Sequence, residues 1–149
     1  MNQENVNVAV EWFKATWTNE GYNPEALRKL AAENVFFKYP LHGERHGVDE
    51  VIEALEALYA SFPDLDFHVV GDIISDGKYV AAKWAGGGTH TGVAFSDNPF
   101  KKEIPANSGK RIEFSGTTIY EIENGKVLSE VGQEEAINVA MQLGLIAPV

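Results

Sequence analysis

The chain contains no cysteine, which excludes disulfides, thiolate nucleophiles and cysteine-ligated metals. Basic residues are scarce, because 12 Lys and Arg against 22 Asp and Glu give a net charge of −10. This charge argues against nucleic acid and anionic membrane surfaces as partners. Long apolar runs are missing too, and no stretch approaches the length that crosses a bilayer. The composition fits a cytoplasmic protein, and we expect that location.

Motifs of several common chemistries are also missing. There is no glycine-rich phosphate loop, and no serine lies in a nucleophile elbow. Residues 1–5 lack the basic start and apolar run of a signal peptide, so we expect no leader. His42, His46 and His90 match no compact metal-ligand spacing. We therefore expect neither a metal nor another cofactor.

What the sequence does contain is a regular succession of amphipathic segments. Its 149 residues suffice for one domain with its own core, and we treat residues 1–149 as that domain. Apolar spacing and capping residues predict four helices, over residues 5–19, 24–31, 48–62 and 134–143. Alternation predicts strands over residues 35–39, 66–74 and 79–90 and a long hairpin over 110–133, with loops at 41–47 and 93–109.

This order of elements predicts an α+β fold, in which a strongly curved, mostly antiparallel sheet is wrapped around the N-terminal helices. Gly86, Gly87 and Gly88 lie inside a predicted strand. Glycine at such positions marks a sharp bend or the close approach of another group. The loop at residues 93–109 has a length typical of lids and disordered segments.

The register of the hairpin decides which side chains face the concave side of the sheet. A two-residue turn at Asn124-Gly125 would place Thr118 opposite Val131 and turn Glu130 to the more polar face. A three-residue turn would place Thr118 opposite Glu130, on the apolar face. The residues alone leave both alternatives open.

Short motifs along nearly the whole chain resemble those of one family, the SnoaL-like polyketide cyclases. The motifs are FPDL at 62–65, GTHTG at 88–92, IP at 104–105, GKR at 109–111, FSG at 114–116, IENGK at 122–126 and QLG at 142–144. The resemblance implies the cone-shaped fold shared with ketosteroid isomerase and nuclear transport factor 2, with a deep pocket inside the cone. It also implies a homodimer formed through the sheet, and the three-residue turn.

The chain departs from this family at its reactive positions. The family's acid/base aspartate corresponds to Gly132 and its neighbouring histidine to Thr118. The resemblance therefore predicts the fold, whereas the chemistry needs other residues.

Glu130 is the first candidate for that chemistry, as a general base whose pKa is raised by an apolar pocket. The alternative is a carboxylate at the pocket rim, paired with a basic residue such as Lys83. His90 is expected near the pocket mouth, holding a substrate oxygen or relaying a proton, or else bound to a neighbouring strand. Tyr39 is expected to stabilise an enolate-like oxygen, or else to be a core tyrosine.

A further set of mostly aromatic residues is expected to line the pocket, although most of them could equally be core. These are Trp12, Phe13, Trp17, Phe37, Trp84, Phe114, Thr118 and Tyr120. The leading hypothesis is a cofactor-free cyclase, isomerase or lyase that moves a proton on a small hydrophobic carbonyl compound. A binding protein for a hydrophobic molecule that is not transformed, and a scaffold domain with a filled cone, are the alternatives.

Overall fold

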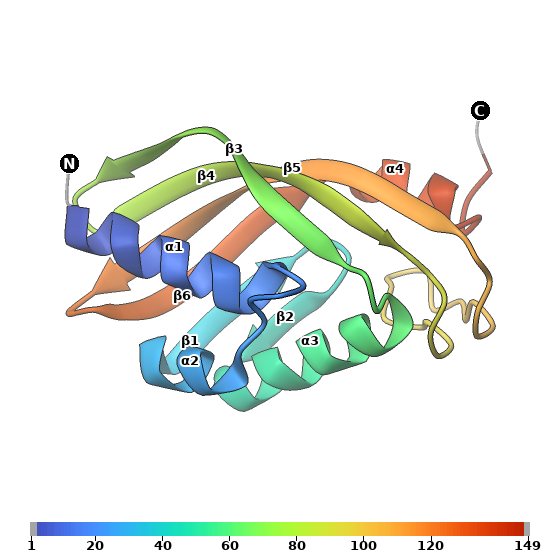
Figure 1. The fold of residues 1–149 in the computed structure, drawn as a ribbon, viewed down its shortest axis with the longest axis horizontal. Coiled ribbons are helices and arrows are strands. Elements are labelled where there is room, and N and C mark those ends of the chain that lie inside the picture. The colour runs from blue at the N-terminus through green and yellow to red at the C-terminus, as the bar shows by residue number, and fades with distance from the viewer. Residues whose placement is uncertain (1–2, 148–149) are drawn as a thin grey trace.

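Within residues 3–147, the part of the chain that the computed structural model describes, four helices and six strands form an α+β fold (Figure 1). The predicted fold class is confirmed. The helices are α1 (Gln3–Trp17), α2 (Pro24–Leu30), α3 (Val48–Ser61) and α4 (Ala136–Gln142). The strands are β1 (Ala31–Tyr39), β2 (Gly43–His46), β3 (Asp66–Asp76), β4 (Tyr79–Thr89), β5 (Arg111–Glu123) and β6 (Lys126–Glu134).

The six described strands form one curved sheet in the order β2-β1-β6-β5-β4-β3. Neighbouring strands are antiparallel except β1 and β6, which are parallel. Helix α1 packs across β3 to β6, and α3 packs against β1 and β2 (Figure 1). The core lies between these helices and the concave face of the sheet.

Local sequence explains where the helices begin and end. The side chain of Asn23 accepts a hydrogen bond from the backbone N–H of Ala26, and Pro24 occupies the first turn of α2. Helix α3 ends before Pro63, a residue that cannot continue a helix. In α1, the apolar stripe predicted from the sequence buries Trp12, Phe13 and Trp17.

The first two strands differ from the prediction. Strand β1 begins at Ala31, which was assigned to the preceding helix, and the predicted loop at 41–47 contains the edge strand β2. Gly43 and Gly47 have positive φ angles of 69° and 84°, which allow the tight turns at either end of β2. A strand of four polar and glycine residues has no apolar alternation, so periodicity could not reveal it.

Both registers considered for the long hairpin are wrong. The turn is the two-residue type, with Glu123 paired to Lys126, and not the three-residue turn that the resemblance implied. The register then shifts, because Ile122 pairs with Val127 while Glu121 pairs with Ser129. The extra residue is a β-bulge. It places Tyr120 opposite Glu130 and turns the Glu130 side chain to the buried face.

The bulge also sets Gly132 opposite Thr118, directly beneath the ring of Tyr39. A Cβ atom at Gly132 would lie 2.0 Å from Cε1 of Tyr39, so a larger residue cannot fit without moving the ring. The absence of a side chain at this position is what allows Tyr39 to pack against β6.

We predict that Gly132→Ala lowers the free energy of unfolding by about 1–3 kcal/mol, because it overpacks a buried contact. Urea unfolding measures this loss. Ser129→Ala, at the position of the same hairpin that pairs with Glu121, serves as a control and is expected to change stability by less than about 0.5 kcal/mol. Equal stability of Gly132→Ala and wild type would show that the Tyr39 ring is not confined.

Candidate functional site

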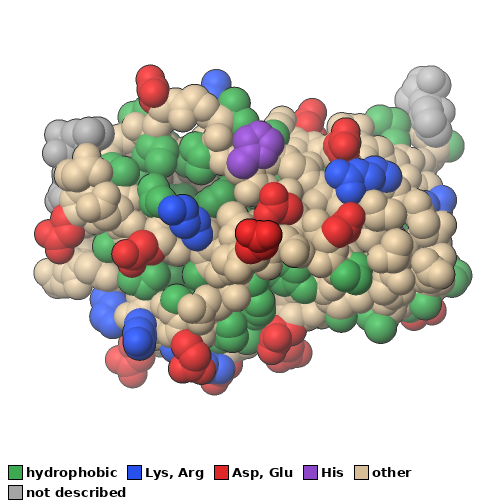
Figure 2. All heavy atoms as spheres, in the orientation of Figure 1, with side chains coloured by type: hydrophobic (Ala, Val, Ile, Leu, Met, Phe, Trp, Pro, Cys, Tyr) green, Lys and Arg blue, Asp and Glu red, His purple; other side chains and the backbone are tan. Residues whose placement is uncertain are grey.

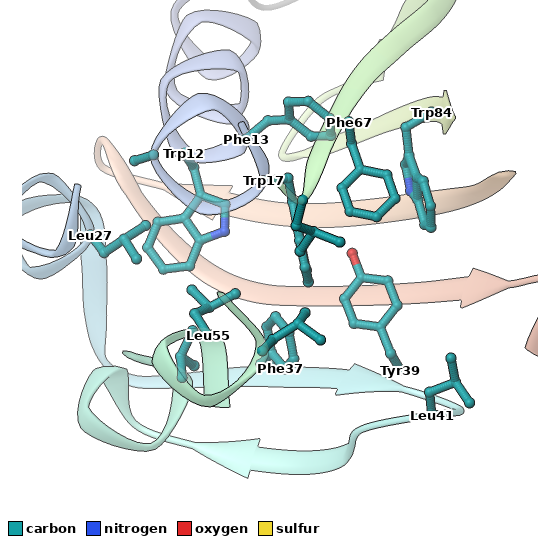
Figure 3. Close-up of a cluster of buried hydrophobic side chains, with 14 of the residues drawn as sticks. Trp12, Phe13, Trp17, Leu27, Phe37, Tyr39, Leu41, Leu55, Phe67 and Trp84 are labelled. Carbon is teal, nitrogen blue, oxygen red and sulfur yellow. The ribbon is translucent and has the colours of Figure 1, made fainter. Parts of the chain in front are cut away.

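The carboxyl group of Glu130 is completely buried and accepts three hydrogen bonds from aromatic side chains. Its Oε1 accepts from the indole N–H of Trp12 at 2.6 Å. Its Oε2 accepts from the indole N–H of Trp17 at 2.7 Å and from the Tyr39 hydroxyl at 2.5 Å. Figure 3 shows these donors coming from α1 and β1, with the Tyr39 hydroxyl pointing toward Trp17 and Trp84. The carboxyl thus ties α1 and β1 to β6.

The network continues through a threonine to the third tryptophan. Because the Tyr39 hydroxyl donates to Glu130, the Thr118 hydroxyl, 2.7 Å away, donates to Tyr39. Thr118 Oγ1 in turn accepts from the indole N–H of Trp84 at 2.9 Å. All three tryptophans of the chain therefore serve one buried polar network.

Burial sets the protonation behaviour of this network. Desolvation raises the pKa of Glu130 above 4.5, although the hydrogen bonds from Tyr39, Trp12 and Trp17 act in the opposite direction. Burial and the neighbouring Glu130 also raise the pKa of Tyr39 well above 10. Tyr39 consequently stays protonated and remains a hydrogen-bond donor.

A mostly apolar cavity lies beside this network, between α3, the sheet and α4. Its volume is about 40 Å³ when measured as the space open to the centre of a water molecule, which is room for about three waters. A larger ligand enters only if wall side chains move. The wall consists of Trp17, Tyr39, Leu41, His42, Leu58, Phe62, Leu65, Phe67, Trp84, Phe95, Ile112, Phe114, Glu134, Val139 and Leu143.

Glu134 is the one carboxylate on this wall. Its Oε1 accepts a hydrogen bond from the backbone N–H of Leu41 at 2.7 Å. Its Oε2 is buried and has no hydrogen-bond partner among residues 3–147. Burial raises the pKa of Glu134 above 4.5, against the opposing effects of the backbone N–H groups of Leu41 and of Glu134 itself and of His42. A buried carboxyl oxygen without a partner calls for an explanation, such as a hydrogen bond to a ligand.

His42 also lies on the wall, together with Glu134 and Tyr39. Its Nδ1 lies 3.0 Å from Oδ2 of Asp97, and the other oxygen of Asp97 accepts from Arg45 at 3.1 Å. Burial alone would raise the pKa of Asp97, but the hydrogen bonds and charges of His42 and Arg45 outweigh it and lower the pKa below 3.8. Asp97 is therefore a carboxylate that only accepts hydrogen bonds.

The residues predicted from the sequence divide between the wall and the layers behind it. Tyr39, Trp17, Trp84 and Phe114 line the cavity. The others do not belong to its wall: Trp12, Thr118 and Glu130 form the network behind it, and Phe37 stacks against Trp17 in the core. The role proposed for Glu130 as a base touching substrate is thus not supported by its position.

Phe13 and Tyr120 lie around a different and smaller space. They border a shallow hollow between α1 and the sheet together with Val10, Val69 and Val80. Figure 2 shows this hollow, bordered by hydrophobic side chains, between α1 and β3. Trp17 of α1 lines the cavity and donates to Glu130, whereas Phe13 of the same helix borders the hollow.

The structure places His90 away from the cavity wall. The side chain is fully buried, its Nδ1 lies 2.7 Å from the Ser108 hydroxyl and its Nε2 lies 2.7 Å from the carbonyl oxygen of Val93. The ring also packs against Phe62. Both ring nitrogens hold the two ends of the 93–109 loop, so neither is free for a substrate.

Sequence reasoning missed His42, Asp97 and Glu134. Glu134 follows Glu130 and Gly132 at the same parity of β6, so extended alternation could have found it. Asp97 reaches His42 only because the 93–109 loop folds back across the β1–β2 turn, and no local pattern signals that contact. Elsewhere in residues 3–147, no group of three His, Asp or Glu side chains is arranged to hold a metal ion, and no helix is long and apolar enough to span a membrane.

The strand order and the enclosed cavity define the nuclear transport factor 2 and ketosteroid isomerase-like fold. Residues 7–143 match the family model described as SnoaL-like polyketide cyclase, and the chain belongs to this family. A search among curated proteins found no match.

Solved structures agree on the fold. A proposed SnoaL-like polyketide cyclase from Jannaschia sp. CCS1 aligns with a TM-score of 0.80 at 16% identity, covering 97% of this chain and 94% of that one. A proposed polyketide cyclase from Acidithiobacillus ferrooxidans aligns with a TM-score of 0.74 at 24% identity, covering 97% and 96%. A ketosteroid isomerase-like protein from Catenulispora acidiphila, solved with trimethylamine, aligns with a TM-score of 0.70 at 18% identity, covering 95% and 97%.

The Glu130 network leads to a prediction about stability and pH. Glu130→Gln leaves at least one buried donor without an acceptor and is expected to cost about 1–3 kcal/mol of unfolding free energy. Because folding raises the pKa of Glu130, the folded state binds its proton more tightly than the unfolded state does. The advantage of wild type over Glu130→Gln is therefore largest below the unfolded pKa and declines as the pH rises through the folded pKa.

Urea unfolding of both proteins between about pH 4 and pH 9 measures this difference. The exposed Glu103, changed to Gln, is the control for loss of one negative charge. An advantage that grows with pH would contradict the raised pKa of Glu130.

Proposed function

We propose that this protein catalyses proton transfer on a small hydrophobic carbonyl compound held in the cavity, as a cofactor-free cyclase, isomerase or lyase. The observation that carries the proposal is Oε2 of Glu134, a buried oxygen that has no hydrogen-bond partner among residues 3–147 and that belongs to a residue of the mostly apolar wall. Membership of the SnoaL-like polyketide cyclase family supports the same class of chemistry.

In this proposal, Glu134 binds the substrate oxygen. Its raised pKa favours the protonated carboxyl, which donates a hydrogen bond from Oε2 to a carbonyl oxygen. When a proton leaves the neighbouring carbon, the electron pair moves onto that oxygen. The hydrogen bond then strengthens, because it faces a developing negative charge in an apolar site.

Tyr39 and Glu130 have a positioning role. The Tyr39 hydroxyl donates to Glu130 and accepts from Thr118, so its proton is already committed. These bonds fix the Tyr39 and Trp17 rings that form one side of the cavity. Binding of a flat apolar molecule depends on that wall.

A non-catalytic binding protein is the second candidate function. The observation that favours it concerns Gly132 and Thr118, which stand where the resemblance places the family's reactive pair. These two residues are paired across β5 and β6, and the Tyr39 ring occupies the space next to Gly132. Under this alternative, an apolar molecule binds the same cavity and leaves unchanged.

The proposed reaction predicts that wild-type protein accelerates exchange of the protons next to the carbonyl of 2-indanone in D₂O, followed by NMR. The rate should fall as the pH rises through the raised pKa of Glu134, because the carboxylate can no longer donate. Glu134→Gln keeps an N–H donor that does not titrate, so it should be slower but lack this fall. Ligand resonances that shift without any exchange would support the binding alternative.

We also propose that the outer face of the sheet joins two copies of this chain, as the family resemblance implies. Ile74, Ala81, Ile119 and Val131 pair in one row across β3 to β6 on the face opposite the core. Ile74 and Ile119, on the two neighbours of β4, are 68% and 50% exposed, so this row presents apolar surface to water. A second copy would cover this row.

Ile119→Glu should therefore shift the protein toward monomer in sedimentation analysis, because it places charges in the centre of the proposed contact. Ile137→Glu is the matched control: Ile137 is 69% exposed but lies on α4. A wild-type protein that is monomeric at micromolar concentration would overturn the dimer.

A further inference from the structure

His42 occupies a position that differs from those of the other histidines. All four histidines lie in the described part of the chain, and His42 is the one on the cavity wall. Its side chain is 11% exposed and lies beside Trp17, nearly parallel to that ring, with centroids 6.4 Å apart. By contrast, His46 is exposed beside Glu44, and both nitrogens of His90 are bonded within the protein.

The partners of His42 fix which ring nitrogen carries the proton. Asp97 is a carboxylate and can only accept, so Nδ1 of His42 must donate to it over the 3.0 Å contact. Arg45 stabilises the contact between His42 and Asp97, because it donates to Asp97 and to the backbone carbonyl oxygen of His42. The imidazole is thus fixed in position and in tautomer.

The contact with Asp97 leaves Nε2 as the ring nitrogen of His42 that can carry a free lone pair. In the neutral imidazole this bond places the proton on Nδ1 and makes Nε2 an acceptor, and Nε2 has no hydrogen bond to any residue in the range 3–147. The ring borders the same cavity as Glu134, whose Oε2 is buried without a partner among the described residues. One group able to take a proton and one able to hold an oxygen therefore meet on a single apolar wall.

We propose that His42 is the general base of the reaction and that Asp97 is its positioning residue; this inference rests on the proposed function. Nε2 takes a proton from the carbon next to the carbonyl, and the C–H electron pair becomes the enolate, whose oxygen is held by Glu134. The resulting imidazolium returns the proton to carbon, so no proton or electron is gained or lost overall. Asp97 offsets the positive charge while it exists.

This geometry selects a class of substrate. The molecule must be an apolar ketone or related carbonyl compound with an acidic C–H beside the carbonyl, and it must be flat enough to lie against Trp17 and Trp84. Charged groups on the molecule would face an apolar wall, where they lose hydration without compensation. Ketones that carry a carboxylate are therefore expected to be poor substrates.

Exchange of the 2-indanone protons in D₂O tests the base. His42→Gln should lower the exchange rate about 100-fold or more, the usual contribution of a general base. His46→Gln, on the exposed strand β2, is the matched control and should exchange at the wild-type rate. Thermal unfolding of each variant verifies that it is folded. Exchange retained by folded His42→Gln overturns the His42 assignment alone, whereas no exchange by wild type counts against the proposed function as well.

Asp97→Asn tests the positioning role with the imidazole left in place. Asparagine can donate to Nδ1, which favours the tautomer with the proton on Nε2 and removes the base from the cavity. We expect ¹⁵N NMR of the His42 ring to show that change of tautomer, together with a loss of exchange of roughly 10²- to 10⁴-fold. An unchanged tautomer and an unchanged rate in Asp97→Asn would overturn the proposal.

Discussion

The structure depends on one buried carboxyl group, that of Glu130, and on the three aromatic donors that surround it. A carboxyl group removed from water is costly unless its oxygens are hydrogen-bonded. The indoles of Trp12 and Trp17 and the phenol of Tyr39 provide those bonds. Because the donors come from α1 and β1 while the acceptor comes from β6, the bonds fix the helix and the first strand to the centre of the sheet. The same rings then form part of the cavity wall.

Much of the fold could be predicted from the sequence because most elements carry strong local signals. The apolar stripe of α1, the Asn23 cap of α2 and the stop before Pro63 are all confirmed. The register of the hairpin could not be predicted from such local signals. A bulge near Leu128 adds one residue to β6, and it has no sequence signature of its own. The three-residue turn predicted that Glu130 lies on the buried face, and Glu130 is indeed buried. The turn has two residues instead, but the extra residue of the bulge turns the Glu130 side chain to that same face.

The candidate site was less predictable than the fold, because its parts come from distant segments. Tyr39 and Trp17 could be anticipated, since they lie on apolar faces of predicted elements. The contact between His42 and Asp97 joins residues 55 positions apart through an irregular loop. His90 illustrates the opposite case: its strand parity suggested a pocket residue, but the ends of the same loop bind both of its nitrogens. Loop contacts of this kind follow from tertiary packing and not from periodicity.

The positions of the polar groups explain how a member of this family can lack the family's reactive pair and retain a site. At Gly132 and Thr118 the space is filled by the Tyr39 ring, and the Thr118 hydroxyl is bonded to Tyr39 and Trp84. Neither Gly132 nor Thr118 lines the cavity. Two residues further along the same strand, Glu134 faces the cavity at the same parity, and the turn after β1 brings His42 to it. In the proposed reaction the acid/base groups therefore lie toward α4 and the 93–109 loop, while the Tyr39 ring above Gly132 forms part of the aromatic wall. Such an arrangement needs only that the groups face the same enclosed space, which the curvature of the sheet provides for side chains from β1 and β6 alike.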